Sequence, residues 1–293
     1  MPDTQPVFRF APSPNGLLHL GHALSAVLNH DTAKAAGGKF LLRIEDIDKT
    51  RCRPEFETAI FEDLHWLGLN WEQPVRRQSE HLDAYATALA RLDGMGIVYP
   101  AAMSRGEIKA AVAKAEAVGR SWPRDPDGSP LYPGQERESS ARERADLIES
   151  GRAYAWRLDM QKAIGLLGDA PLTWIESGAG PSGEDGIIVA DPAAWGDVIL
   201  SRSDAPSSYH LSVTVDDALQ GITHVVRGRD LYHATSVHRL LQSLLGLPEP
   251  LYHHHRLVLG TDGRKLSKSN QDTGIAAFRS AGHSPEDVRA LIV

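Results

Sequence analysis

Cysteine is almost absent from this 293-residue chain, which has a single one, Cys52. One thiol excludes an intrachain disulfide and any zinc site built from several cysteines. No stretch approaches the roughly 20 consecutive apolar residues that a membrane helix needs. Residues 1–6 carry no basic stretch and no apolar core, so we expect no signal peptide, no membrane association and a cytoplasmic location.

An excess of basic residues is also missing, because the formal net charge is −7. This balance argues against a protein that coats nucleic acid non-specifically, although it leaves room for a local basic surface. The hydrophobic content of 42% and the charged content of 24% are ordinary for a soluble globular protein. The length therefore suggests one large domain or two modest ones, with a sizeable core.

The pattern of apolar residues predicts alternating strands and helices in both halves of the chain. In the first half we expect strands at 8–11 and 40–44, and helices at 18–36, 54–68 and 79–94. After residue 187 we expect strands at 198–201, 223–226 and 251–259, and helices at 209–219 and 230–245. This alternation predicts a parallel sheet with right-handed crossovers, and therefore an α/β fold.

The stretch between these halves has a different pattern. Helices are expected at 105–118 and 141–150 and a strand at 154–158, among loops rich in proline, aspartate and glycine. We therefore predict a nucleotide-binding domain in two parts, residues 1–100 and 187–260, interrupted by an inserted α+β module at 101–186. Residues 261–293 are expected to form a lysine-containing loop and a helical tail.

Two short stretches far apart in the sequence have the composition of phosphate-binding loops. In the first, residues 9–16 lead into His19-Leu20-Gly21-His22, where a strand should pass through a loop into a helix. Such a helix start offers free backbone N–H groups and a positive dipole end. A glycine at 21 permits close approach of a ligand, and His19 and His22, three apart, face one side of the helix. One histidine alone would more often be an ordinary surface or core residue.

The second stretch supplies Lys265 and Lys268 near the other end of the chain. Two lysines at this spacing commonly form a solvated surface patch. Together with the histidines, however, they predict two loops that bind one polyphosphate from two sides.

Three other features have plainer interpretations. Residues 253–255 are consecutive histidines on a strand, so their side chains point to opposite faces, which favours a partly buried strand over a metal site. The sequence leaves open whether His210 lines the pocket, and whether residues 216–217 reach it or face solvent.

These motifs together resemble those of the class I aminoacyl-tRNA synthetases. His19-Leu20-Gly21-His22 is similar to the HIGH motif of that class, and Lys265-Leu266-Ser267-Lys268-Ser269 to its KMSKS motif with leucine for methionine. Arg9-Phe10-Ala11-Pro12-Ser13-Pro14 narrows the resemblance, which extends from about residue 8 to 270, to the glutamyl/glutaminyl branch. It implies a Rossmann-like catalytic domain, ATP with Mg²⁺, and His19, His22, Lys265 and Lys268 as catalytic groups, with ATP bound by His19, Gly21, His22 and Lys268.

The resemblance also implies the residues that bind L-glutamate: Arg9, Phe10, Ala11, Pro12, Ser13, Glu45, Tyr209 and Arg227. The chemistry suits each polar position, because two arginines can hold carboxylates, Glu45 can pair with the ammonium group and the Tyr209 phenol can donate a hydrogen bond. Taken singly, Glu45 could equally belong to a solvated acidic loop and Arg227 to a surface salt bridge. Which arginine holds which carboxylate stays open.

A narrower resemblance comes from the 24 residues that follow Ser269 (293 minus 269), too few for the anticodon-reading domain of full-length glutamyl enzymes. The chain resembles the short glutamyl-queuosine tRNA(Asp) synthetases, which tend to carry valine where Val213 stands. That resemblance implies tRNA-independent activation of glutamate, transfer to queuosine in the anticodon loop of tRNA(Asp), and a monomer. The alternatives are a minimal glutamyl-tRNA synthetase charging a tRNA 3′ end, and a non-catalytic ATP-binding paralogue.

The chain departs from this resemblance at a zinc site. Many of these paralogues bind zinc in the inserted module through Cys-x-Cys followed by Tyr-x-x-x-Cys, and the matching positions here are Ala101, Met103, Tyr132 and Glu136. One tyrosine and one carboxylate are a poor tetrahedral zinc site. We therefore expect no structural zinc and a module held together by apolar packing.

Overall fold

The computed structural model describes residues 5–203, 205–260, 264, 266 and 274–292. The two lysines predicted to bind phosphate, Lys265 and Lys268, lie outside the described residues. Within this part of the chain, no helix combines the length and the apolar character needed to cross a membrane.

A seven-stranded sheet forms the centre of the larger part of the molecule, in the order β3-β2-β1-β9-β10-β6-β7. Its strands are β1 (Val7–Phe10), β2 (Lys39–Ile44), β3 (Glu72–Arg77), β6 (Thr173–Glu176), β7 (Gly186–Val189), β9 (His224–Gly228) and β10 (Leu251–His255). All neighbours run parallel except β6 and β7, which are antiparallel. The predicted α/β, Rossmann-like fold class is confirmed.

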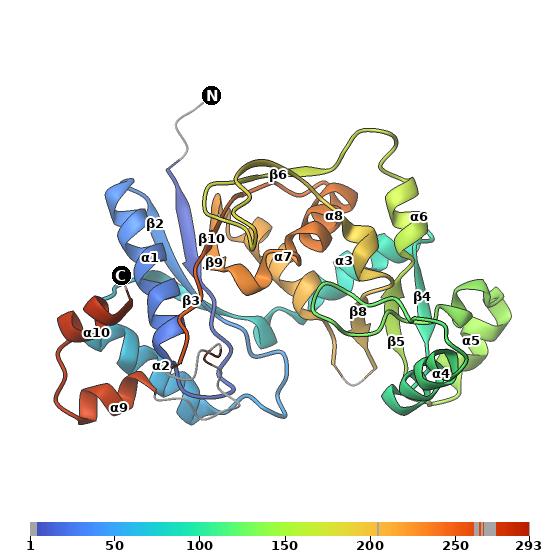
Figure 1. Ribbon diagram of the computed structural model, residues 1–293, viewed down its shortest axis with the longest axis horizontal. Helices are drawn as coiled ribbons and strands as arrows, with labels where there is room; N and C mark the ends of the chain where they lie inside the picture. Colours follow the sequence, from blue (N-terminus) through green and yellow to red (C-terminus); the bar gives the residue numbers. More distant parts are fainter. Residues whose placement is uncertain (1–4, 204, 261–263, 265, 267–273, 293) are drawn as a thin grey trace.

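Helices cover both faces of this sheet (Figure 1). Alternate residues of β1 and β2, such as Phe8, Phe10 and Leu42, pack against α1 (Leu20–Ala35), α2 (Pro54–Trp66), α9 (Ile275–Ser280) and α10 (Pro285–Ile292). A second apolar core joins α3 (Leu82–Gly94), α7 (Tyr209–Leu219) and α8 (Thr235–Leu245) to α6 (Met160–Gly165) and the smaller sheet. Consecutive residues of β1 (8–10) and β9 (225–227) are buried, so the central strands of the sheet are covered on both faces, as in other parallel sheets.

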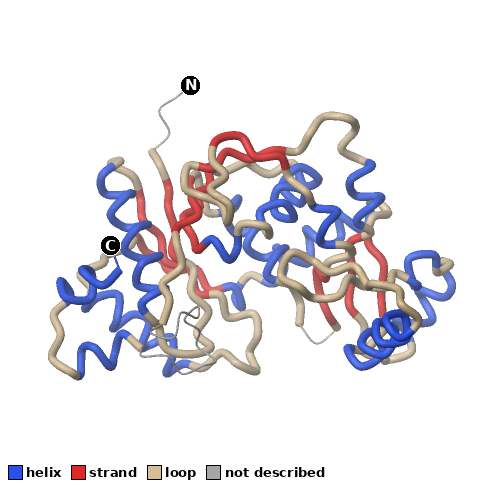
Figure 2. The backbone as a smooth tube through the Cα atoms, viewed as in Figure 1, coloured by secondary structure: helices blue, strands red, loops and turns tan. Residues whose placement is uncertain are grey.

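The smaller sheet consists of β4 (Val98–Ala101), β5 (Ala155–Leu158) and β8 (Ile199–Arg202), all antiparallel. Beside it lie α4 (Arg105–Ala117) and α5 (Ala141–Glu149), at the end of the molecule opposite α9 and α10 (Figure 2). The strand expected at 198–201 belongs to this sheet, so its predicted place in the parallel sheet was wrong.

Other differences from the expected elements are local. The helix expected at 230–245 begins only at Thr235, because residues 229–231 form a 3₁₀ turn, and β10 ends at His255. Strands β3, β4, β6 and β7 were not expected; the sequence of β3, Glu-Gln-Pro-Val-Arg-Arg, is mostly polar and contains proline. The domain boundaries stay a prediction, although β6, within the expected 101–186 module, pairs with β10 of the large sheet.

Candidate active site

A cavity of about 510 Å³ opens where β1, β2 and β9 end and α1 begins. The carboxyl ends of parallel strands are where ligands bind in open α/β sheets. Every described residue that the sequence assigned to the site lines it: Arg9, Phe10, Ala11, Pro12, Ser13, His19, Gly21, His22, Glu45, Tyr209 and Arg227. The structure thus brings together side chains from four separate segments, and their roles stay predictions.

The two histidines form one wall of the cavity and also cap α1. His19 Nδ1 accepts a hydrogen bond from the Gly21 backbone N–H (3.1 Å), and His22 Nδ1 accepts one from the His19 N–H (3.2 Å). Each neutral imidazole therefore carries its proton on Nε2, the nitrogen that can donate to an anion. A Cβ at position 21 would lie 3.0 Å from the His19 ring, so glycine leaves room for this arrangement.

The segment after the lysine motif returns to this wall. Gly274 forms a β-bridge with His19, and the Ile275 N–H donates to the carbonyl of Leu18 at 2.8 Å. Leu266, within the lysine motif, also lines the cavity. Two segments 255 residues apart (274 minus 19) therefore meet at the start of α1, as the predicted binding of one polyphosphate by both loops requires.

On the opposite side, a buried acidic pair at the end of α7 holds the arginines. Asp217 accepts hydrogen bonds from Arg9 (Nε, 3.0 Å; Nη2, 3.3 Å) and from Arg43 Nη1 at 2.7 Å. Arg43 Nη2 in turn donates to Glu45 at 3.2 Å. Residues 216–217 do not face solvent; Asp217 orients Arg9, a role that the sequence left open.

Burial and the neighbouring charges shift the pKa values of these carboxyl groups in different directions. Burial raises the pKa of Glu45, and the nearby Arg43 and Arg9 offset the rise only in part. Burial would also raise the pKa of Asp217, but Arg9 and Arg43 outweigh it and lower that pKa. Ion pairs thus join three acids, Glu45, Asp216 and Asp217, to three arginines, at positions 9, 43 and 76.

Arg227 is buried in the same cavity wall but has a different environment. Its guanidinium donates to His254 Nε2 (3.1 Å), His238 Nδ1 (3.2 Å) and Thr235 Oγ1 (2.7 Å), and also to the Leu231 carbonyl and the Tyr209 hydroxyl. All of these groups are uncharged, and no acid of the described chain forms an ion pair with it. A buried cation without a counter-ion is costly, so this position favours an anionic ligand.

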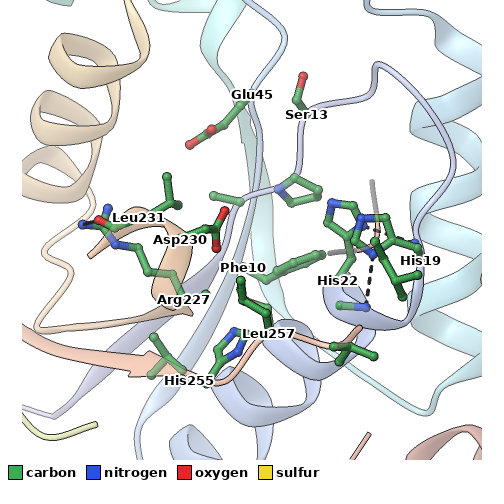
Figure 3. A pocket seen from close by; sticks show the side chains of 18 of the residues that line it. Phe10, Ser13, His19, His22, Glu45, Arg227, Asp230, Leu231, His255 and Leu257 are labelled. Carbon is green, nitrogen blue, oxygen red and sulfur yellow. Dashed lines mark hydrogen bonds between the residues drawn. The ribbon is translucent and has the colours of Figure 1, made fainter. Parts of the chain in front are cut away.

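Figure 3 shows how these groups divide the cavity. His19 and His22 lie on one side of Phe10, and Arg227 lies on the other, with Glu45 and Ser13 at a third edge. The cavity can therefore hold a polyanion beside the histidines and a second anionic group beside Arg227.

Comparison with known proteins now decides the family. The sequence model of the class I tRNA synthetases (E and Q), catalytic domain, matches residues 6–167 and 182–293. This chain belongs to that family. It is therefore a ligase of the aminoacyl-tRNA synthetase type, as the motifs predicted.

Relatives of this synthetase fall into a short and a long group. A glutamyl-Q tRNA(Asp) synthetase from Rhodobacter capsulatus is 45% identical over 98% of this chain and 99% of its own length. One from Symbiobacterium thermophilum is 38% identical over 96% and 83%. A glutamate–tRNA ligase from Prochlorococcus marinus is 37% identical, but the match covers only 56% of that protein.

A solved structure supports the same assignment. The crystal structure of glutamate-tRNA synthetase from Elizabethkingia anophelis superposes on this synthetase with a TM-score of 0.80 at 26% identity. The match covers 99% of this chain and 61% of that one, so the chain spans about three fifths of the solved protein.

The synthetase has a second cavity, of about 570 Å³, next to the first. The two share Ser13, Asn15, Glu45, Arg51 and Tyr209 in their walls. The remaining wall comes largely from the small sheet and its loops, and includes the side chains of Tyr132, Arg157, Trp195 and His210. His210 thus lines a pocket, but the neighbouring one.

Of the three consecutive histidines on β10, His254 and His255 are buried and His253 is half-buried, so the predicted partial burial is confirmed. In the part of the chain described here, no three histidine, cysteine, aspartate or glutamate side chains could together hold a metal ion. Sequence reasoning missed the contacts of His254 and His238 with Arg227 because they join separate elements. The only signal was the chemistry: a buried arginine needs acceptors, and imidazoles are acceptors when neutral.

Proposed function

We propose that this synthetase activates glutamate with ATP to glutamyl-adenylate, without needing tRNA, and transfers the glutamyl group to queuosine in the anticodon loop of tRNA(Asp). One observation carries the amino-acid part of the proposal: the buried Arg227 guanidinium, which has no counter-ion among the described residues, faces a cavity whose other wall carries donors suited to phosphates. The acceptor is supported by the short relatives, which match this chain over nearly its whole length.

Glutamate would lie between Arg227 and Glu45. Arg227 Nη1 exchanges its long contact with the Tyr209 hydroxyl (3.5 Å) for one substrate carboxylate, and Glu45 pairs with the ammonium group. Arg9 Nε and Nη2 already donate to Asp217, whose carboxylate compensates the charge of Arg9. Arg9 therefore offers the substrate at most its remaining nitrogen, Nη1. The two arginines are therefore unequal partners for the substrate, a difference that the sequence left open.

ATP, with its Mg²⁺, would lie along the start of α1. A carboxylate oxygen of glutamate attacks the α-phosphorus, an oxygen–phosphorus bond forms, and pyrophosphate leaves. His19 and His22 donate from Nε2 to phosphoryl oxygens, and the helix N-terminus adds its dipole. No protein nucleophile is required, because the substrate supplies it, and the chain contributes positioning and charge stabilisation.

The acceptor would arrive through the second cavity. That cavity adjoins the first across Glu45 and Tyr209, so a hydroxyl group within it can approach the glutamyl carbonyl. Its wall includes Trp195, an apolar surface for a ring, and polar groups such as His210 and Arg157. We expect a monomer to suffice, because both cavities are built from one chain.

The test uses labelled glutamate and the purified protein. We expect glutamate-dependent ATP–pyrophosphate exchange in the absence of tRNA, and label on tRNA(Asp) only when it contains queuosine. Label at the 3′ end of tRNA(Glu) would instead identify a minimal glutamyl-tRNA synthetase. No exchange under any of these conditions would mean a non-catalytic ATP-binding paralogue.

A further inference from the structure

Two residues behind Arg227, His254 and Glu176, form with it a chain of hydrogen bonds, which we call the relay. Arg227 Nε donates to His254 Nε2 at 3.1 Å, and an arginine can only donate, so Nε2 carries no proton. The neutral His254 ring must then bear its proton on Nδ1, which lies 2.5 Å from Glu176 Oε2. The order of donors and acceptors along the relay is therefore fixed.

Glu176, at the end of β6, is almost fully buried and has a partner for each oxygen. Oε1 accepts from the backbone N–H groups of His254 (2.8 Å) and Gly178 (2.9 Å), and Oε2 also accepts from Trp174 Nε1 (3.4 Å). Burial opposes ionisation here, yet the His254 contacts outweigh it and lower the pKa of Glu176 to about 2. The carboxylate is thus charged and held rigidly.

His254 itself stays neutral. Burial lowers its pKa to about 4, although Glu176 pulls in the other direction. The His254 imidazole therefore orients Arg227 without placing the negative charge of Glu176 in contact with it. His238 offers Arg227 a second imidazole acceptor, because its Nδ1 accepts from Arg227 Nη1 at 3.2 Å and burial lowers its pKa as well.

Arg9, in the same cavity wall, is held directly by a carboxylate instead of through an imidazole. Asp217 contacts it directly through two hydrogen bonds, so its charge is compensated by a carboxylate. Arg227 is held by hydrogen bonds to neutral groups, and it forms no ion pair with any acid in the described part of the chain. Two arginines that line one cavity thus differ in the charge they leave for a ligand.

We propose that Glu176 and His254 are positioning residues that hold Arg227 through a neutral imidazole, so that its charge stays available to select a carboxylate over an amide. The inference rests on the proposed function, in which the ligand is glutamate and the competitor to be excluded is glutamine. It gives strand β6, which lies between β10 and β7, a role in specificity, although β6 contributes no residue to the cavity wall.

The backbone beside the relay fits the same interpretation. A Cβ at Gly178 would lie 2.5 Å from the carbonyl oxygen of His254, 2.7 Å from its nitrogen and 2.9 Å from Glu176 Oε1. Only glycine lets the chain after β6 close over this carboxylate. Gly178→Ala should therefore disturb the relay without removing any of its functional groups.

The experiment compares Glu176→Gln with wild type in glutamate-dependent pyrophosphate exchange. We expect the KM for glutamate to rise about tenfold, as for a lost hydrogen bond to a charged group. The KM for ATP should stay within about twofold, and the preference for glutamate over glutamine should fall. A purely structural role would instead lower the melting temperature and leave both KM values unchanged.

Two substitutions of His254 separate the halves of the relay. His254→Gln places an acceptor near the Nε2 position but loses the bond to Glu176, and His254→Asn keeps a donor for Glu176 but loses the bond to Arg227. Both should raise the KM for glutamate. A normal KM in His254→Gln would show that Glu176 is not needed, and would overturn the proposal even if Glu176→Gln failed to fold.

Gly178→Ala should reproduce the effect, and Gly165→Ala is its control, because a Cβ there meets nothing within 4 Å. Unchanged glutamate KM and unchanged selectivity in folded Glu176→Gln and Gly178→Ala would also overturn the inference. If wild type shows no glutamate-dependent exchange, the proposed function fails instead, and the two failures are distinguishable.

Discussion

Asp63, on α2, shows at the scale of one residue how burial alone shifts an acid. Its side chain is fully buried, and neither oxygen receives a hydrogen bond from any described residue. Arg279 on α9 comes no closer than 3.5 Å. Burial is the main cause that raises the pKa of Asp63, from 3.8 to about 6.

This pKa predicts a pH-dependent stability. Because the folded state holds the proton more tightly than the unfolded chain, the stabilisation is complete below about pH 4 and is lost as the pH rises through about 6. Asp63→Asn removes this titration. As the pH rises between these values, we therefore expect the free energy of unfolding of the variant to increase relative to that of wild type, by up to about 3 kcal/mol. Urea unfolding at pH 4, 5, 6 and 7.5 measures the difference.

The matched control is Glu62→Gln, which removes an exposed carboxylate beside the same arginine. Its stability should follow that of wild type across the same pH range. If the curves for Asp63→Asn and wild type also run parallel, the buried carboxyl group is not titrating as proposed.

At the scale of single elements, the sequence located helices better than strands. The starts of α4, α5 and α7 follow serines that accept a backbone N–H, Ser104, Ser140 and Ser208, and such caps are local signals. Strand pairing is not local. Nothing in residues 173–176 indicates that they will pair with β10, so neither β6 nor the contact between Glu176 and His254 could be predicted.

The candidate site divides in the same way. Arg9 and Arg227 lie near the carboxyl ends of β1 and β9, and Glu45 directly follows β2; motif and position together predicted that these segments would meet. The groups behind them, Asp217, His238 and His254, were missed or left open. Each acts through a contact between elements far apart in the sequence, and only the fold brings these together.

The short element η2 (Gln135–Glu138) occupies the place where the resemblance implied zinc. The Glu136 carboxylate accepts from the backbone N–H groups of Ala102 (3.1 Å) and Met103 (3.3 Å), and from the Tyr132 hydroxyl (2.6 Å). Arg157 stacks on the Tyr132 ring, 3.6 Å from its centroid. This corner is therefore joined by polar contacts, where the sequence predicted apolar packing; the absence of zinc stays a prediction.

We expect Glu136→Ala to loosen this corner alone. Loss of the carboxylate leaves two backbone N–H groups and one hydroxyl without their acceptor, at a cost of about 1–3 kcal/mol. Hydrogen exchange at residues 102–104 should accelerate, while glutamate-dependent exchange of pyrophosphate is unaffected. Tyr132→Phe, which removes one of the three bonds, should give a smaller change. Unaltered protection in Glu136→Ala, or stoichiometric zinc in protein purified without added metal, would contradict this account.

At the scale of the whole molecule, Asp216 ties the two halves of the chain together. It is completely buried at the end of α7 and accepts from Arg76 Nε (2.7 Å), Gln78 Nε2 (2.8 Å) and the Tyr85 hydroxyl (2.9 Å). These partners lie on β3, the following 3₁₀ turn and α3, more than 130 residues earlier. One carboxylate thus fixes α7, and with it Tyr209 and Asp217, against the first half of the large sheet.

Asp216→Asn should therefore weaken the entire fold. The amide cannot compensate Arg76, and breaking a buried charge network typically costs about 3–5 kcal/mol. We expect the midpoint of urea unfolding to fall accordingly, with a single transition in both proteins, because the network spans both halves. Asp146→Asn is the control: its pair with Arg142 is exposed and 3.9 Å long, so its removal should cost less than about 0.5 kcal/mol. Equal costs for the two substitutions would mean that apolar packing alone, and not this carboxylate, joins the halves and holds the site in shape.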